Sequence, residues 1–302
     1  MTLLVTGTIA IDSIITPFGE LESCLGGSAT YFSVAAGHFT WVFLVGAVGE
    51  DFPEDYLKIF DGRPIDTTGL EKRPGSLTFR WKGSYAGAMN EARTLDTQLN
   101  VIAEEPPTIP EKFRHADFVF LANTAPDVQL KLLRQVKSPQ LSMADTMNYW
   151  IQNNRDDLLK LIDHIDSMVL NDTEARMFTG QDNLITAAAD IVQMGLEFIV
   201  IKKGEHGTLL MTKDKQCFVL PAYPTADVKD PTGAGDSFAG GMMGYLAAQN
   251  AFDLTTLKKA IAYGTVTASL VIEDFSLRRW HTAARPDIDQ RYRQLKEMMQ
   301  FK

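Results

Sequence analysis

The stretch that most restricts how this chain can fold is a loop of small residues that leads straight into a long helical pattern. Thr232, Gly233, Ala234 and Gly235 form the loop, and the helical pattern runs through Ala247. Glycines in such a loop let a ligand approach the backbone closely. The first turn of a helix also carries unpaired N–H groups and partial positive charge, which together favour anions. The pattern therefore predicts a helix start that faces an anionic ligand.

Asp236 follows this loop directly and has two interpretations. As an N-cap, its carboxylate would accept a hydrogen bond from the backbone of the first helical turn. As a catalytic base, it would take a proton from a nucleophile beside the bound anion. A carboxylate next to a phosphate site is poorly placed to bind phosphate, but it is well placed to deprotonate a hydroxyl that attacks one. The loop by itself leaves both interpretations open.

From residue 116 onward, short apolar segments alternate with helical patterns. The predicted strands are Asp117–Ala122, Leu141–Asp145, Ser167–Asn171, Phe198–Lys202, Thr208–Met211 and Cys217–Leu220. This alternation predicts a parallel sheet with helices on both faces. In such sheets, ligands bind outside the carboxyl ends of the strands. The polar residues expected at that edge are Asn123, Asp145, Asn171, Glu174 and Lys202.

The N-terminal part of the chain has a different character. Thr2–Gly7 and Trp41–Val48 are predicted to be buried strands. Ser76–Lys82 alternates apolar and polar residues, which predicts a half-exposed strand, and Glu91–Val101 is a candidate for another. A two-faced antiparallel piece inside an alternating chain indicates a separate small sheet.

Two further features near the N-terminus have both a structural and a functional interpretation. A lone aspartate near a strand end, here Asp12, is more often a turn or cap residue than a ligand-binding group. Gly26 and Gly27 open a helix of small residues, so either a ligand or a neighbouring strand can lie close to its start. The bare sequence does not separate these possibilities.

Composition excludes several function classes. The chain has 302 residues, which fits one large domain, and its formal net charge of -9 argues against nucleic-acid or anionic-membrane binding as the main role. No apolar run is long enough for a membrane span, and no signal-peptide pattern is present, so we expect a cytoplasmic protein. Cys24 and Cys217 lie far apart and form neither a disulfide framework nor a zinc pattern, so both are expected to be reduced core residues.

The run from Asp230 through Asp236, followed by Gly240 and Gly241, resembles the C-terminal signature of the PfkB/ribokinase family of small-molecule kinases. The motifs that carry the resemblance occur in the family's order at 12, 26–27, 171–174, 202–207 and 230–243. The resemblance implies one ribokinase-like α/β domain over residues 1–302, a three-layer α/β/α sandwich with a mostly parallel central sheet. It also implies a small β-sheet lid, formed by about 12–24 and 74–103.

On the phosphate side, the resemblance implies that Asp236 is the base and that the backbone of Gly233–Gly235 holds the γ-phosphate of ATP. Asn171 and Glu174 would organise Mg²⁺ and the phosphates, largely through water; magnesium keeps several waters and prefers oxygen ligands. These two residues also fit a helix cap, and both roles are compatible. In some relatives the residue equivalent to Asp230 helps to bind a monovalent cation such as K⁺. The residues expected to contact the nucleotide are Lys202, Gly204, Gly207 and Thr232.

On the acceptor side, the resemblance implies that Asp12 binds two sugar hydroxyls, since a carboxylate can accept from two donors. Gly26–Gly27 would shape the sugar pocket, and Asn123 lies where relatives place substrate contacts. Many ribokinases have a lysine directly after the glycine pair and an asparagine three residues further, whereas this chain has Ser28 and Tyr31. An aromatic residue suits a substrate with a flat or apolar face, such as a nucleoside, although Tyr31 could equally lie in the core.

The resemblance therefore predicts an ATP-dependent phosphotransferase that acts on a hydroxyl of a sugar or nucleoside, with a homodimer through the lid as an option. A ligand-sensing protein that keeps the fold without turnover is an alternative, but a sensor needs no base such as Asp236. A kinase of phosphosugars is another alternative, and it would want a basic cluster for the substrate phosphate. Arg80 and Lys82 are the basic residues of the lid that we consider for that purpose.

Overall fold

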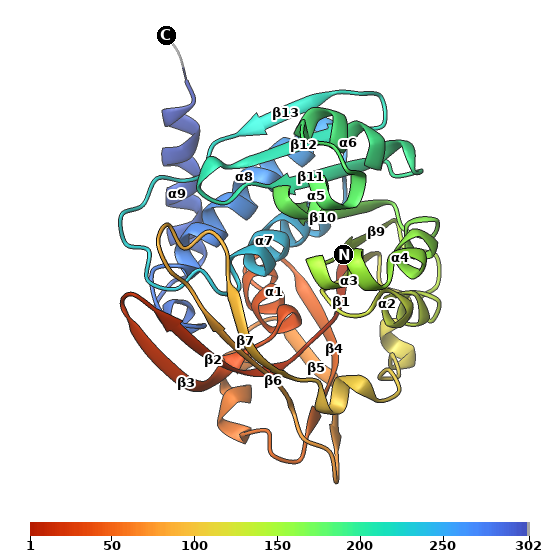
Figure 1. The fold of residues 1–302 in the computed structure, drawn as a ribbon, viewed down its shortest axis with the longest axis vertical. Helices are drawn as coiled ribbons and strands as arrows, with labels where there is room; N and C mark the ends of the chain where they lie inside the picture. The colour runs from red at the N-terminus through yellow and green to blue at the C-terminus, as the bar shows by residue number, and fades with distance from the viewer. Residues whose placement is uncertain (301–302) are drawn as a thin grey trace.

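Nine strands form one large sheet in the computed structural model, which describes residues 1–300 (Figure 1). They are β1 (Thr2–Thr6), β4 (Trp41–Gly49), β5 (Ile65–Arg73), β8 (Phe118–Leu121), β9 (Leu141–Asp145), β10 (Ser167–Asn171), β11 (Phe198–Lys202), β12 (Thr208–Thr212) and β13 (Cys217–Leu220). Their order is β13-β12-β11-β10-β9-β8-β1-β4-β5. All neighbours from β11 to β5 pair in parallel, and β12 and β13 are antiparallel at one edge. The mostly parallel sheet predicted from the alternating pattern is confirmed.

Helices cover both faces of this sheet. They are α1 (Ser28–Ala36), α2 (Pro126–Leu133), α3 (Asn148–Asn153), α4 (Arg155–Ile162), α5 (Asp172–Thr179), α6 (Leu184–Gln193), α7 (Ala234–Gln249), α8 (Leu254–Val271) and α9 (Arg285–Met298). One apolar core joins the sheet to α1, α7, α8 and α9, and a second core joins the other face to α2, α4, α5 and α6. Successive residues of β1 alternate between them, because Leu3 and Val5 enter the first core and Leu4 the second. The three-layer sandwich is confirmed.

A second, smaller sheet lies beside the large one (Figure 1). Its strands are β2 (Ala10–Thr16), β3 (Gly19–Gly26), β6 (Phe79–Ser84) and β7 (Arg93–Gln98), in the order β3-β2-β6-β7. The two outer pairings are antiparallel and the central pairing of β2 with β6 is parallel. We call these four strands the small sheet. They fall close to the segments expected for the lid, although the first strand begins before residue 12.

Several local expectations differ from the structure. The edge strand β5 was not expected, because its sequence mixes threonines, a glycine and charged residues and shows no continuous apolar run. The segment Pro53–Phe60, whose spacing predicts an amphipathic helix, forms a 3₁₀-helix over Glu54–Phe60. Cys24 is buried as expected, but Cys217 is exposed, because it lies on the edge strand β13. The remaining 3₁₀-helices are Asn100–Ala103, Glu111–Phe113, Gly204–His206 and Arg278–His281.

Candidate active site

The loop of small residues, Thr232–Gly235, leads into helix α7; because it was predicted to face a phosphate, we call it the phosphate loop. Gly233 is the N-cap, in the left-handed backbone region with a φ of 74°. A Cβ atom at this position would lie 2.3 Å from the ring of Tyr31, so only glycine fits. The N–H of Ala234 donates to the carbonyl of Pro231 at 3.1 Å, whereas those of Gly233 and Gly235 have no protein acceptor within the described residues. These two N–H groups are the ones available to an anion.

Asp236 lies in the first turn of α7 and is not its cap. The cap position belongs to Gly233, and no side chain caps this helix. The N-cap interpretation of Asp236 is therefore wrong. Burial raises the pKa of Asp236 to about 7, and the nearby Asp145 carboxylate adds to the rise while Lys202 opposes it. Near neutral pH a carboxyl group with such a pKa can both accept and release a proton, which suits a general base.

Charged side chains from two parallel strands meet beside this helix start. Lys202, at the end of β11, forms an ion pair with Asp145, at the end of β9, with 3.3 Å between Nζ and Oδ2. The Lys202 ammonium also lies 2.9 Å from where a Cβ of Gly235 would be. Burial alone would lower the pKa of Lys202, but the surrounding carboxylates, Asp145 first, raise it. A partly buried cation thus lies next to the phosphate loop.

Asn171 and Glu174 form a reciprocal cap at the start of α5. The backbone N–H of Glu174 donates to Asn171 Oδ1 at 2.8 Å, and that of Asn171 donates to Glu174 Oε2 at 2.6 Å. The helix-cap interpretation is therefore present in the structure. Burial raises the pKa of Glu174 to about 7, with the Asp145 carboxylate as the next cause. Glu174 Oε1 takes no part in the cap.

Asp12 lies in strand β2, and its carboxylate faces the start of α1. A Cβ on Gly26 would lie 1.8 Å from Asp12 Oδ2, so the glycine makes room for the carboxylate. Burial raises the pKa of Asp12 to about 8; the Gly27 backbone opposes this rise, while the carboxylates of Asp230 and Asp236 add to it. The glycine pair and Asp12 thus form one unit, which lies near the phosphate loop.

Tyr31 belongs to the core. Its side chain is 1% exposed, it packs in the apolar core of the α1 face, and its ring fills the space beside Gly233. Of the two interpretations of this residue, the core position is the one that the structure shows. A ring that is buried in this way has no open face on which a substrate could stack.

Asp230 is fully buried and ties two loops together. Its Oδ1 accepts the N–H of Thr232 at 2.9 Å, and its Oδ2 accepts the N–H of Ser276 at 2.8 Å. The hydroxyl of Thr232 donates to the hydroxyl of Tyr85, 3.3 Å away, in the chain that follows β6. Asp230 therefore links the phosphate loop to the loop that contains Ser276. Tyr85, which follows strand β6 of the small sheet, contacts the phosphate loop through Thr232.

Asn123 follows β8 and is held by two neighbours that sequence patterns did not single out. Its Oδ1 accepts the indole N–H of Trp150 at 3.0 Å, and its Nδ2 donates to the sulfur of Met147 at 3.3 Å. Trp150 lies in the short helix α3, which was not predicted. The only sequence signal for this contact was the position of both residues after neighbouring strands.

The loop after β11 bends through two glycines with positive φ, Gly204 at 54° and Gly207 at 84°. A Cβ on Gly207 would lie 2.0 Å from the carbonyl oxygen of Leu220, so this position also requires glycine. The loop between β6 and β7 reaches across to this side. There Asn90 Nδ2 donates to Glu205 Oε1 at 2.9 Å, and Thr173 Oγ1 donates to Glu91 Oε1 at 3.2 Å.

The two basic residues of β6 already have acidic partners. Arg80 pairs with Asp51 at 2.6 Å, and Lys82 lies 3.6 Å from Glu20 and 4.0 Å from Glu22. Neither is a free cation for a substrate phosphate. The structure thus favours the simpler interpretation of both as paired strand charges.

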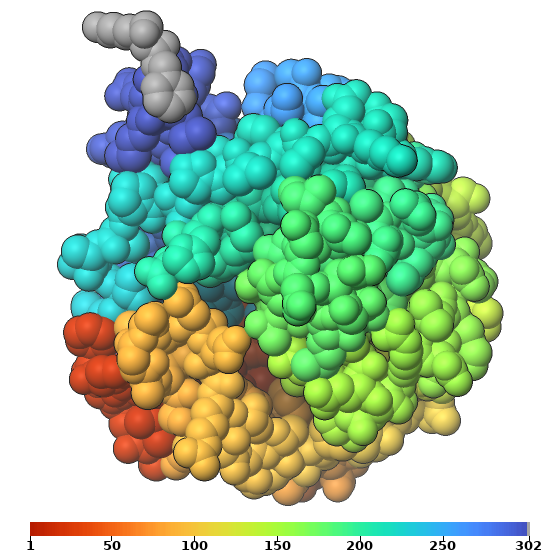
Figure 2. Space-filling view, turned by 45° about the horizontal axis from the view of Figure 1, so that its top comes forward, coloured from red at the N-terminus to blue at the C-terminus, as the bar shows by residue number. Residues whose placement is uncertain are grey.

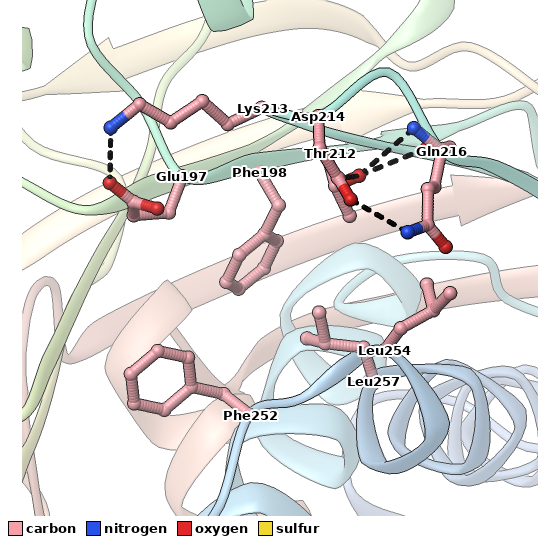
Figure 3. A pocket seen from close by; sticks show the side chains of 9 residues that line it. All are labelled: Glu197, Phe198, Thr212, Lys213, Asp214, Gln216, Phe252, Leu254 and Leu257. Atoms are coloured by element: carbon pink, nitrogen blue, oxygen red, sulfur yellow. Dashed lines mark hydrogen bonds and ion pairs between the residues drawn. The ribbon is translucent and has the colours of Figure 1, made fainter.

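The surface is hollowed between the orange part of the small sheet and the green segments of the large sheet (Figure 2). A different hollow, of 610 Å³, lies at the opposite ends of β11 and β12 (Figure 3). Phe198, Phe252, Leu254 and Leu257 line it, beside the ion pair of Lys213 with Glu197. Since Phe198 begins β11 whereas Lys202 ends it, this second hollow lies away from the charged cluster.

Within residues 1–300, no helix is long and apolar enough to cross a membrane. In the same part of the chain, no group of three or more His, Cys, Asp and Glu side chains is arranged to hold a metal ion by itself.

Comparisons with known proteins agree with this architecture. Residues 13–282 match the model of the pfkB family of carbohydrate kinases. The cytidine kinase of Thermococcus kodakarensis is 30% identical over 252 residues, which cover 80% of this chain and 87% of that protein. The solved nucleoside kinase of Methanocaldococcus jannaschii superposes with a TM-score of 0.76 and 22% identity, covering 97% and 98% of the two chains. A ribokinase-like protein of E. coli in complex with ATP and Mg²⁺ superposes with a TM-score of 0.77 and 16% identity, covering 97% and 99%.

Proposed function

The chain belongs to the pfkB family of carbohydrate kinases, and from this premise we propose that it transfers the γ-phosphate of ATP to a hydroxyl of a nucleoside, with Asp236 as the base. Membership of this family indicates that the protein is a kinase of a sugar or nucleoside and that it uses ATP with Mg²⁺. The finer choice of a nucleoside is supported by the 30% identity to a cytidine kinase over most of both chains. The observation that carries the base is the partly buried carboxyl group of Asp236 in the first turn of α7, whose pKa is raised to about 7.

The proposed chemistry divides between this carboxylate and the loop. Asp236 takes the proton of the acceptor hydroxyl as the hydroxyl oxygen attacks the γ-phosphorus of ATP, while the bond from this phosphorus to the bridging oxygen breaks and ADP leaves. The N–H groups of Gly233 and Gly235 face the phosphoryl oxygens, and that of Ala234 can join them only by leaving the Pro231 carbonyl. The Lys202 ammonium beside Gly235 offsets negative charge on the same group. Positioning and electrostatics then supply most of the rate.

The acceptor is held on the opposite side by Asp12, whose two oxygens accept from neighbouring hydroxyls of the sugar ring. Asn123, fixed by Trp150, is proposed as a further acceptor contact. Such donors stabilise the ionised form of the Asp12 carboxyl group, which burial keeps protonated near neutral pH in the empty site. We therefore expect acceptor binding to release a proton from Asp12.

The nucleotide and its metal ion are assigned to the ends of β10 and β11. Mg²⁺ supplies charge neutralisation to the ATP phosphates. The oxygens of Asn171 and Glu174 suit it, held through water, because Glu174 Oε1 takes no part in the helix cap. The residues that we assign to the nucleotide itself are Lys202, Gly204, Gly207 and Thr232.

Replacing Asp236 by Asn tests the base. We expect turnover to fall by about 10²- to 10⁴-fold with ATP and acceptor binding retained, because the amide keeps the shape and cannot accept the proton. Wild-type turnover should rise with pH through about 7, where the buried carboxyl group ionises. The measurement is ADP release with ATP and Mg²⁺ across nucleosides and free sugars, with phosphosugars as a separate arm.

The matched control for this variant is Asp227→Asn, an exposed carboxylate earlier in the same segment. It should leave turnover unchanged. Near-full turnover of Asp236→Asn would show that another group is the base. Turnover on free sugars alone would refute the nucleoside assignment, and binding of ATP without turnover on any acceptor would favour the sensor alternative.

Three further points belong to the same proposal. Asp230 is the residue to which we assign a monovalent cation such as K⁺. Comparing the turnover rate in KCl with that in tetramethylammonium chloride tests this assignment. A homodimer through the small sheet would cover the exposed Phe18 and Leu95, and sedimentation velocity reports it. We also place the protein in the cytoplasm, where ATP is abundant.

A further inference from the structure

One face of strand β6 is directed at the site. Because β2 and β6 pair in register, Ala10, Asp12 and Ile14 stand beside Phe79, Trp81 and Gly83, respectively. Directly paired residues of neighbouring strands project to the same face of a sheet. The Asp12 carboxylate is directed at the glycine pair at the start of α1, so this face looks into the acceptor side.

A second contact supports this orientation independently. Tyr85 continues the alternation of β6, and its N–H donates to Ile15 at 2.8 Å. Its hydroxyl accepts from Thr232 of the phosphate loop at 3.3 Å. Trp81, Gly83 and Tyr85 therefore share one face of the small sheet. This face extends from Asp12 to the phosphate loop.

We propose that Trp81 is the aromatic platform on which the base of the nucleoside stacks. This inference rests on the proposed nucleoside kinase function and names the part of the site that would recognise the base. Sugar hydroxyls held by Asp12 would leave the base attached to the same sugar within reach of the neighbouring indole. The role first expected of Tyr31 thus passes to a residue whose ring is only half-buried.

Gly83 creates the space for this ring. A Cβ on Gly83 would lie 2.0 Å from the Trp81 indole, so the ring rests against the glycine backbone. The indole N–H donates to Thr94 Oγ1 at 3.1 Å, which fixes the ring from β7. Trp280, by contrast, is 0% exposed and belongs to the core.

This arrangement sets the kind of recognition. Because Thr94 uses the only polar group of the indole, Trp81 offers a ring face and no hydrogen bond. Stacking on a ring face accepts any flat base. Trp81 should therefore add affinity for nucleosides in general, and discrimination between bases must come from other residues.

The test compares cytidine with free ribose as acceptors at saturating ATP and Mg²⁺. Trp81→Leu should raise KM for cytidine by about 10- to 100-fold, the loss expected for one base–aromatic contact, with kcat changed by less than about threefold. Its KM for ribose should stay unchanged, because ribose has no base. Trp81→Phe keeps an aromatic face and should restore most of the affinity.

Trp41→Leu is the matched control, because Trp41 is 61% exposed at the first residue of β4, away from the site. Gly83→Ala is a second probe that keeps the tryptophan and displaces its ring; it should raise KM for cytidine like Trp81→Leu. It also serves if Trp81→Leu does not fold.

The outcomes separate this inference from the function on which it rests. A wild-type enzyme that phosphorylates ribose and no nucleoside refutes the proposed function before any variant is made. If the wild type phosphorylates cytidine, equal rises in KM for cytidine and ribose would reduce Trp81 to a packing residue. An unchanged KM for cytidine in both Trp81→Leu and Gly83→Ala would overturn the stacking role.

Discussion

Gly233 and Tyr31 share one space under the phosphate loop. The left-handed conformation of Gly233 turns the chain into α7, and the buried ring of Tyr31 fills the volume that a side chain would need. The loop therefore takes its shape from the core of the α1 face and not from its own residues alone. A change at either residue should act on the two N–H groups that we assign to the phosphate.

We predict that Gly233→Ala lowers turnover by about 10²- to 10³-fold, similar to the loss of one oxyanion donor. The added Cβ would lie 2.3 Å from the Tyr31 ring, so the loop must move. Gly62→Ala is the matched control: Gly62 has a φ of 71° and open space around its Cβ position. Both variants should lose about 1–2 kcal/mol of unfolding free energy from the backbone alone. Steady-state turnover rates of the two variants give the readout. Equal rates for Gly233→Ala and Gly62→Ala would argue against a role of the phosphate loop in catalysis.

At the scale of single residues, the sequence predicts well which residues carry chemistry. It predicts less well which side chains are accessible to a ligand. Asp145 and Lys202 were identified because polar residues at the strand ends of a parallel sheet gather at one edge, and the structure brings these two into an ion pair. Tyr31 and Trp81 could not be told apart in this way. Their exposure depends on which elements pack around them, and one sequence does not contain that information.

At the scale of elements, the loop between β6 and β7 links the two sheets across the site. The exposed contacts at its tip include the bonds from Asn90 to Glu205 and from Thr173 to Glu91. Exposed hydrogen bonds contribute little to global stability, so such a loop can open locally while the rest stays folded. Opening is required if ligands are to enter the hollow beneath it.

We predict that Asn90→Ala speeds amide hydrogen exchange in residues 85–92 by about two- to tenfold, the effect of losing one hydrogen bond of about 0.5–1.5 kcal/mol. Global thermal stability should stay the same, because the bond is exposed. Gln98→Ala is the control, since the Gln98 side chain bonds only to Asp96 within its own strand. Mass spectrometry of exchanged peptides gives the readout, and equal protection in both variants would show that the contact does not hold the loop.

The elements themselves were predictable to different degrees. Strands such as Phe198–Lys202 and Ser167–Asn171 were predicted with the observed bounds, because a buried parallel strand needs a continuous apolar run. The edge strand β5 carries no such run, and its partner β4 decides its structure. The parallel pairing of β2 with β6 was also beyond the sequence pattern, since it joins segments far apart in the chain.

At the scale of the whole molecule, some of the acidic residues behind the formal net charge of -9 are buried at the candidate site. Burial raises the pKa of Asp12 to about 8 and those of Glu174 and Asp236 to about 7. Acidic groups in the empty site therefore resist ionisation. A ligand that brings hydroxyl donors, or magnesium with ATP, would stabilise the ionised carboxylates and lower their pKa values. Ligand binding should therefore be linked to the release of protons.

The free energy of unfolding of the protein without ligand should depend on pH because of these groups. The folded pKa of Asp12, about 8, lies above its usual value of 3.8. Between these values the folded state holds a proton that the unfolded state has lost, so the free energy of unfolding falls as pH rises. We predict that wild type loses more stability between pH 5 and 8 than Asp12→Asn, by at least about 1 kcal/mol, because one pKa unit corresponds to about 1.4 kcal/mol. Urea unfolding of both proteins without ligand measures the difference.

Asp214→Asn is the control for this slope. Hydrogen bonds from Thr212 and Gln216 lower the pKa of the exposed Asp214, so its titration ends below pH 5 and its loss should leave the slope unchanged. Parallel slopes for wild type and Asp12→Asn would mean that Asp12 is ionised in the empty site. If the predicted slope is found, a bound acceptor that donates hydroxyls to the Asp12 carboxylate should stabilise the protein more at pH 8 than at pH 5, since binding then replaces the proton.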